Sequence, residues 1–132
     1  MENVTADSIV GNSTSGGVGF TNVNVKKANL DVTSGSFKMD GCEIEELIAE
    51  STSGGVKVED TKIDNADLDV SSGGVNLNLS GDVNDYDFDL SVTSGSIRIN
   101  DEKKDGDYIL STGKDKKIKV ETSSGGININ IN

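Results

Sequence analysis

The chain contains no histidine, no proline and no tryptophan, and it has one cysteine among its 132 residues. Without histidine, a catalytic relay of serine, histidine and an acid cannot form. A zinc site would lack its usual nitrogen and sulfur ligands for the same reason. Because Cys42 has no second cysteine to pair with, an internal disulfide is excluded. We therefore expect a non-enzymatic protein with no catalytic, cofactor-binding or metal-binding residues.

Aromatic residues and long apolar runs are also scarce. Three Phe and two Tyr leave little surface on which a sugar ring could stack. No stretch reaches the ~20 apolar residues of a membrane-spanning helix. The first residues are acidic and polar, and no signal peptide is visible in them. We expect no membrane span in this chain.

A Ser-Gly pair recurs along the chain, and its first four copies are 19 residues apart. A fixed period near twenty residues is typical of one structural unit stacked on copies of itself. Glycine accepts the positive φ of a sharp corner, and a neighbouring hydroxyl can bond the local backbone. The six pairs are Ser15-Gly16, Ser34-Gly35, Ser53-Gly54, Ser72-Gly73, Ser94-Gly95 and Ser124-Gly125.

Apolar residues keep fixed places within each unit and come in pairs two residues apart, which is the period of a strand. Three such pairs per unit predict three short strands, so that each unit is one turn of a coil. Equivalent residues would stack about 4.8 Å apart, as Val18, Phe37 and Val56 should. We predict an all-β fold, a three-sided, single-stranded parallel β-solenoid of about 19 residues per turn, and we expect a right-handed coil. A β-sandwich is the alternative, but a sandwich does not require the same turn to recur at a fixed interval along the sequence.

The repeat predicts a single domain over residues 1–132. Residues 1–13 would form a degenerate first coil that caps one end, and residues 14–92 the regular coils. Residues 93–132 would hold a coil with an insert, and they end in the alternating stretch Ile127–Asn132. We expect this last strand to leave an outer edge open for pairing.

Two units are longer than the rest. The first contains turn residues 81–85, and the second contains an insert with the hairpin signal Asp105-Gly106. The register recovers at Ile118 and Val120. Tyr86 and Tyr108 lie in these units, and we expect them to cover the core where the coil widens, with partner binding as the alternative. Cys42 should be a small buried apolar residue.

The charge is strongly acidic, with a formal net charge of −11. This argues against nucleic acid as a partner. Asp31, Glu50 and Asp69 should stack in one column, and Asp40 and Glu59 in another. Solvent screening or a bound calcium ion would relieve their repulsion, although no calcium-loop motif is present. Six lysines form a local basic patch, which is either a solvated face or a contact for an anionic cell-wall polymer or lipid: Lys103, Lys104, Lys114, Lys116, Lys117 and Lys119.

The stretches 86–99 and 117–127 contain the motifs Val92-Thr93-Ser94-Gly95-Ser96-Ile97 and Thr122-Ser123-Ser124-Gly125-Gly126-Ile127. With the earlier Thr-Ser-Gly repeats, they resemble a bacterial adhesin-like family of Ser-Gly repeat domains of unknown function. The resemblance covers nearly the whole chain. It implies a β-solenoid and a location at the bacterial cell envelope or surface, and it carries over no catalytic residues.

Three functions follow as hypotheses. The first is a non-enzymatic, adhesin-like interaction module of the bacterial envelope, with a protein or cell-wall polymer as partner. The second is a membrane-proximal scaffold or sensory domain that self-associates end to end through the edge at Ile127–Asn132. The third is a carbohydrate-active enzyme that uses acidic residues, an analogy of fold alone.

Overall fold

The computed structural model describes residues 2–100, 102–104 and 107–131. The described chain is almost entirely β-strand, with one short 3-10 helix, η1 (Val83–Asp85). The predicted all-β class is confirmed. The region from Cys42 to Glu50, which is rich in glutamate, is strand as expected, because it lies in β5 (Glu43–Ser53).

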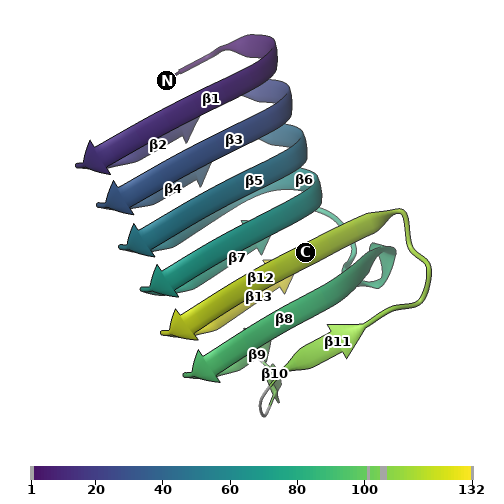
Figure 1. Cartoon of the computed structure of the whole chain (residues 1–132). Coiled ribbons are helices and arrows are strands. Elements are labelled where there is room, and N and C mark those ends of the chain that lie inside the picture. The colour runs from purple at the N-terminus through teal and green to yellow at the C-terminus, as the bar shows by residue number, and fades with distance from the viewer. Residues whose placement is uncertain (1, 101, 105–106, 132) are drawn as a thin grey trace.

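Each regular turn contributes one short and one long strand, and these form two ladders (Figure 1). The short-strand ladder runs in the order β2 (Val18–Thr21), β4 (Phe37–Asp40), the start of β6 (Val56–Ser72), β7 (Val75–Leu79), β13 (Ile127–Ile131), β9 (Ile97–Ile99) and β10 (Glu102–Lys104). The long-strand ladder runs β1 (Thr5–Ser15), β3 (Asn24–Ser34), β5, the rest of β6, β12 (Lys116–Ser124), β8 (Tyr86–Ser94) and β11 (Tyr108–Leu110).

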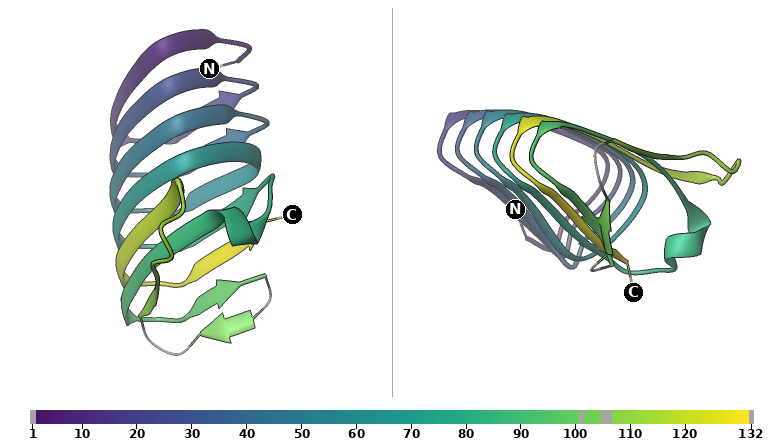
Figure 2. Two further views of the ribbon diagram at one scale, coloured as in Figure 1. Left: turned by 90° about the vertical axis from the view of Figure 1, so that its right-hand side faces the viewer. Right: turned by 90° about the horizontal axis from the view of Figure 1, so that it is seen from below.

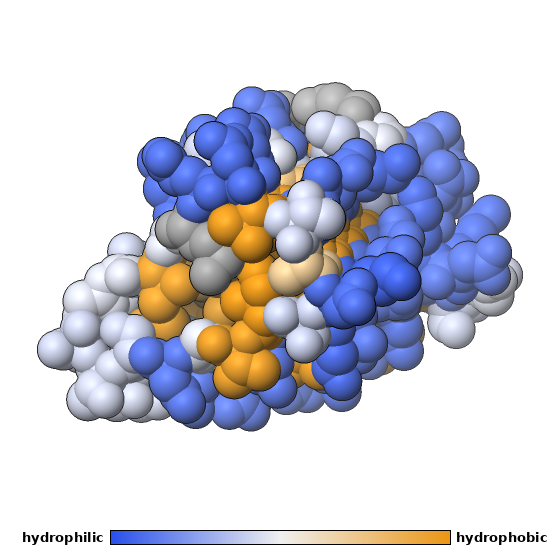
Figure 3. All heavy atoms as spheres, turned by 90° about the horizontal axis from the view of Figure 1, so that it is seen from above, coloured by the Kyte–Doolittle hydropathy of each residue, from blue (hydrophilic) through white to orange (hydrophobic). Residues whose placement is uncertain are grey.

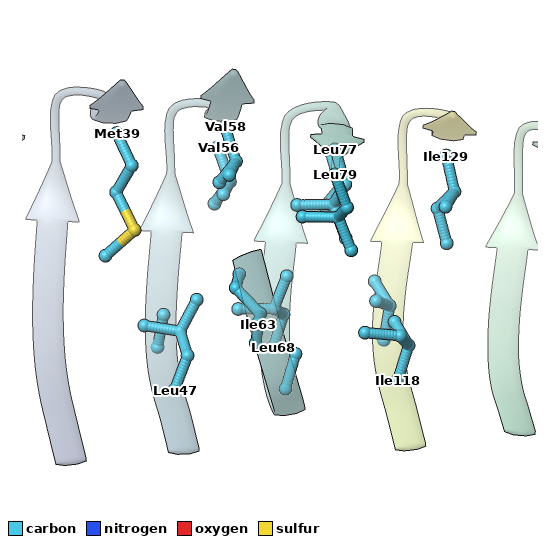
Figure 4. Packing of buried hydrophobic residues seen from close by; sticks show 14 of the residues in the cluster. Met39, Leu47, Val56, Val58, Ile63, Leu68, Leu77, Leu79, Ile118 and Ile129 are labelled. Carbon is cyan, nitrogen blue, oxygen red and sulfur yellow. The ribbon is translucent and has the colours of Figure 1, made fainter. Parts of the chain in front are cut away.

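Equivalent residues of successive turns lie opposite one another, as the 19-residue period predicts. Val18 pairs with Phe37, and Phe37 pairs with Val56, in parallel strands. Viewed along the stack, the turns superpose as nested loops (Figure 2). The inward side chains form rows, such as Met39, Val58, Leu77 and Ile129 (Figure 4). Burial of each such aliphatic side chain stabilises the fold by about 1.5–3 kcal/mol.

The strand count per turn differs from the prediction. The second and third expected strands run together as one long strand, as in β3 and β5. Within β3 the in–out alternation slips at Lys26 and Lys27, which are both exposed, and buried positions resume at Ala28. Neither Gly nor Pro lies between these positions to end the strand. The backbone therefore bends without losing its pairing.

The Ser-Gly corners work as predicted. Gly54 has φ +124°, and a Cβ built on it would overlap the carbonyl oxygen of Gly35 in the preceding turn. Hydroxyl bonds run between turns, since Ser34 Oγ donates to the Thr14 carbonyl at 3.1 Å. The corner thus requires glycine both for its backbone conformation and for the close stacking of turns.

The last turn does not lie at the end of the coil. β12 and β13 insert between the turn formed by β6 and β7 and the turn formed by β8 and β9 (Figure 1). Ile118 and Val120 lie opposite Ala66 and Leu68, which confirms the predicted recovery of register. The prediction of an open edge at Ile127–Asn132 was wrong, because β13 pairs with β7 along residues 127–131 and with β9 along residues 127–129. The Ile131 N–H on the β9 side bonds Asn100 Oδ1. Asn132 lies outside the described residues.

The two ends of the stack are built differently. At one end the short strands β10 and β11 turn back and pair antiparallel with β9 and β8. The hairpin signal Asp105-Gly106 between them lies outside the described residues. At the other end β1 adds a long strand in register with β3. Within the described chain, that strand begins the ladder.

Cys42 is a buried structural residue, as expected. Its side chain is 1% exposed, beside the equally buried Val23 and Thr61 of neighbouring turns. Its Sγ lies 3.5 Å from the Asp40 carbonyl oxygen, and its backbone N–H donates to Thr61 Oγ1 at 3.4 Å. Packing and weak local hydrogen bonds therefore explain why a small side chain such as cysteine occupies residue 42.

Candidate functional site

The acidic columns predicted from the repeat are present in the structure. Asp31 lies opposite Glu50, and Glu50 opposite Asp69; Asp40 lies opposite Glu59. Lys57 Nζ contacts Glu59 Oε1 at 3.1 Å. In the part of the chain that the structure describes, no group of three His, Cys, Asp or Glu side chains is placed to hold a metal ion. These columns are open rows along the surface.

A shallow groove, which we call the axial groove, crosses successive turns on the described surface. It has a volume of about 530 Å³ and lies beside the bend of the long strands. Its floor contains Ala6, Val25 and Ile44, which are equivalent residues of three turns. Its lining residues are Thr5, Ala6 and Asp7 of β1, Asn24, Val25 and Lys26 of β3, Glu43, Ile44 and Glu45 of β5, Lys62 and Asp64 of β6, and Lys116 of β12.

The charges of the axial groove are nearly balanced, unlike those of the whole chain. Four carboxylates and three ammonium groups line it, whereas the chain has a net charge of −11. Lys116 Nζ lies 3.8 Å from Asp64 Oδ1 and 5.5 Å from the centre of the Tyr86 ring. The 3.8 Å contact is too long for a strong hydrogen bond, so the lysine can still turn towards a ligand.

Tyr86 lies next to Lys116 of the groove and is anchored in the core. Its side chain is 1% exposed, and its hydroxyl donates to the Ile63 carbonyl at 2.6 Å. Burial, together with the nearby negative charges of Asp64 and Asp85, raises the pKa of Tyr86 to about 12. The expectation that Tyr86 covers the core where the coil widens is confirmed.

A second hollow of about 390 Å³ lies at the end closed by β10 and β11, and we call it the cap pocket. Phe88 forms part of its lining, and the half-buried Tyr108 packs against Phe88 with ring centres 6.2 Å apart. Lys104 Nζ lies 4.9 Å from the centre of the Tyr108 ring. The pocket is lined by Asn84, Tyr86, Phe88, Ile99, Asn100, Glu102, Lys104, Tyr108, Leu110, Thr112 and Lys114. Tyr108 thus covers the core and also faces this pocket.

Asp87 holds the loop that returns the chain from β11 to β12. Its carboxylate accepts bonds from the Thr112 hydroxyl at 2.7 Å and from the backbone N–H groups of Thr112, Gly113 and Lys114 at 3.0–3.1 Å. These bonds, led by the one from the Thr112 side chain, lower the pKa of Asp87. No pattern in the sequence pointed to this role, because the bonds join residues about 25 positions apart.

The lysines of the predicted basic patch lie on several different elements. Lys117 and Lys119 lie on β12, where Lys119 is opposite Asp67 on one side and Asp89 on the other. Lys104 and Lys114 lie at the cap pocket, and Lys116 lies at the axial groove. The β12 lysines therefore separate two acidic strands, which is a structural role that the patch interpretation missed.

The family model described as Toastrack DUF4097 matches residues 1–130, so the chain belongs to this family. Neither a curated protein nor a solved structure matches the chain in the comparisons made. Within the described residues, no helix is long and apolar enough to cross a membrane.

Proposed function

We propose that this member of the Toastrack DUF4097 family is a non-enzymatic, adhesin-like interaction module of the bacterial cell envelope. The observation that supports the proposal is the axial groove, which crosses successive turns of the coil at the same structural position. A groove that repeats its geometry from turn to turn suits an extended ligand better than a compact one. The ligand class we propose is a cell-wall polymer that carries charged groups.

The slip in alternation at Lys26 and Lys27 recurs at the equivalent residues of β1 and β5, and it divides each of these long strands into two parts. Together with the short strand, these parts would give each turn three sides. We include this three-sided, right-handed coil in the proposal, because a bend at the same residue of each turn would produce a continuous concave face.

The charges of the groove suggest how it would hold such a polymer. Lys26 of β3 and Lys62 of β6 both line the groove, but they lie on different turns and on opposite sides of its floor, because Lys62 is in the column of Asn24. They could contact anionic groups spaced along a chain. The carboxylates between them would repel a uniformly anionic polymer and favour one with mixed charge. Recognition would then depend on whether the charges along the polymer have the same spacing as the charges along the groove, and less on the total charge of the polymer.

A glycan and cell-wall polymer array tests the proposal, followed by titration of any hit with the variant Lys26→Glu/Lys62→Glu. The matched control is Lys38→Glu/Lys57→Glu, which makes the same charge change on the short-strand ladder. We expect the groove variant to weaken binding roughly tenfold or more and the control to leave it unchanged. Equal loss in both variants, or no hit on the array, would contradict the proposal.

A further inference from the structure

The N-terminal end of the stack contains the longest unprotected edge in the described structure. β1 spans 11 residues and pairs with β3 alone. The hydrogen bond from the Asn24 N–H to the Val4 carbonyl, at 2.8 Å, shows which residues of this segment direct their backbone groups towards β3. In a parallel ladder every second residue directs its backbone N–H and C=O groups away from its neighbour. β1 therefore presents a row of backbone groups that suits another strand.

The opposite end has the features that normally prevent such pairing. β10 and β11 are three residues long, and both run antiparallel to the strands they cover. β10 consists entirely of charged residues, and Lys104 Nζ contacts Glu102 Oε1 at 3.2 Å. Short edges and edge charges both discourage strand addition. The difference between the ends excludes simple head-to-tail stacking, which would need an open edge at each end.

β1 is also nearly uncharged. Asp7 is its single charged residue, whereas β5, two turns further along, contains four glutamates. In a chain with a net charge of −11, a second copy would be repelled from most of the surface. The β1 edge carries a net charge of −1 from Asp7, so a copy that approaches this edge meets little of this repulsion.

Apolar side chains lie along the same end. Val10 is 76% exposed, although its counterpart in the next turn is the polar Asn29. Ile9 is half-buried against the core and is covered on one side only, as are Val4 and Ala6. Figure 3 looks onto this end and shows apolar residues along its middle, with hydrophilic residues around them. The internal rows of the coil therefore reach the surface here.

We propose that this end binds the same end of a second copy of the chain, with β1 of one copy antiparallel to β1 of the other. A two-fold axis perpendicular to the sheet makes neighbouring identical strands antiparallel and keeps both inner faces on one side. The two cores then meet at Ile9 and its neighbours, and the long-strand ladder continues through the dimer. The inference is independent of the ligand proposed for the axial groove.

The test is sedimentation of the full chain from roughly 1 µM to 1 mM, together with hydrogen exchange at both concentrations. We expect a dimer that strengthens with added salt, because salt screens the repulsion between acidic bodies. Amides of β1 should exchange more slowly in the dimer. Ile9→Lys should weaken the dimer about 100-fold or more, since it places a charge between the two cores. Val10→Lys, on an exposed site that leaves folding intact, should weaken it about tenfold.

The matched control is Ile109→Lys, because Ile109 is the other large exposed apolar side chain among the described residues and lies on β11 at the closed end. We expect it to leave dimerisation unchanged. A wild-type chain that stays monomeric at the highest concentration would overturn the proposal. So would open-ended growth to larger assemblies, or equal weakening by Ile109→Lys and Val10→Lys.

Discussion

The side-chain amide of Asn130 donates a hydrogen bond of 3.1 Å to the side-chain oxygen of Asn78, across 52 residues of chain. The bond joins the last described strand to a strand in the middle of the sequence. It exists because β13 fills the space between β7 and β9. The final turn therefore closes the fold from within, and its residues should matter as much as those of any central strand.

The first prediction concerns this inserted turn. Ile129 is 0% exposed in β13, and we expect Ile129→Ala to lower the free energy of unfolding by about 2–5 kcal/mol through lost burial and a residual cavity. Ile109→Ala is the control, because its side chain is 69% exposed, and it should change stability by less than about 0.5 kcal/mol. Urea denaturation measures both. A loss at Ile129 no larger than at Ile109 would show that β13 is a loosely attached tail.

The second prediction separates two roles of the corner glycine. Gly16 has φ +101° with open space where a Cβ would lie, whereas Gly54 has φ +124° and the Gly35 carbonyl in that space. Gly16→Ala should cost about 1–2 kcal/mol from backbone strain alone. Gly54→Ala should cost clearly more, because stacked turns must move apart. Thermal denaturation of the two variants decides the matter, and equal melting temperatures would argue against close stacking at the corners.

The third prediction is a pH effect at Asp87. Its hydrogen bonds lower its pKa in the folded state, so it contributes stability above the ordinary carboxyl pKa of ~3.9. This contribution is lost as the pH falls below that value towards the lowered pKa. We expect Asp87→Asn to be less stable than wild type at pH 7 and the gap to narrow at about pH 2–3. A stability difference between wild type and variant that stays constant from pH 7 to about pH 2–3 would mean that the negative charge of Asp87 does not hold the loop between β11 and β12.

The fourth prediction concerns Tyr86. Its pKa of about 12 lies above its ordinary value of 10.0, so the protonated hydroxyl contributes stability below pH 10 that is lost as the pH rises towards 12. Tyr86→Phe should cost about 1–3 kcal/mol at pH 7, because it leaves the buried Ile63 carbonyl without its bond. Titration of tyrosine absorbance should show one late ionisation that is absent from the variant. If that late ionisation persists in Tyr86→Phe, the assignment is wrong.

The sequence was enough to predict the all-β class, the 19-residue register and the glycine corners. Each of these follows from local pattern, namely strand periodicity and the need for positive φ at a corner. The order of the last turns could not be predicted from the apolar columns, because Ile127 and Ile129 would fit beside any turn. Their side chains are chemically equivalent to those of every other unit.

A signal for the inserted turn was nevertheless present in the charges. With turns in simple succession, Asp89 would lie beside Asp67, about 4.8 Å away, and the two would repel. In the structure Lys119 lies between them. Alternating charge along a column therefore favours the observed order. The axial groove was harder to foresee, since it depends on where the long strands bend rather than on any motif.

The central claim is that the last turn lies inside the stack, and cysteine cross-linking in a Cys42→Ala background tests it most directly. In simple succession Asn78 would lie beside Asn100, whereas in the structure Asn130 lies beside Asn78, and the Ile131 N–H bonds Asn100 Oδ1 at 2.8 Å. We predict that the pair Asn78→Cys/Asn130→Cys oxidises readily to a disulfide and that Asn78→Cys/Asn100→Cys does not. The reverse result would place the turns in sequence order and contradict the fold described above.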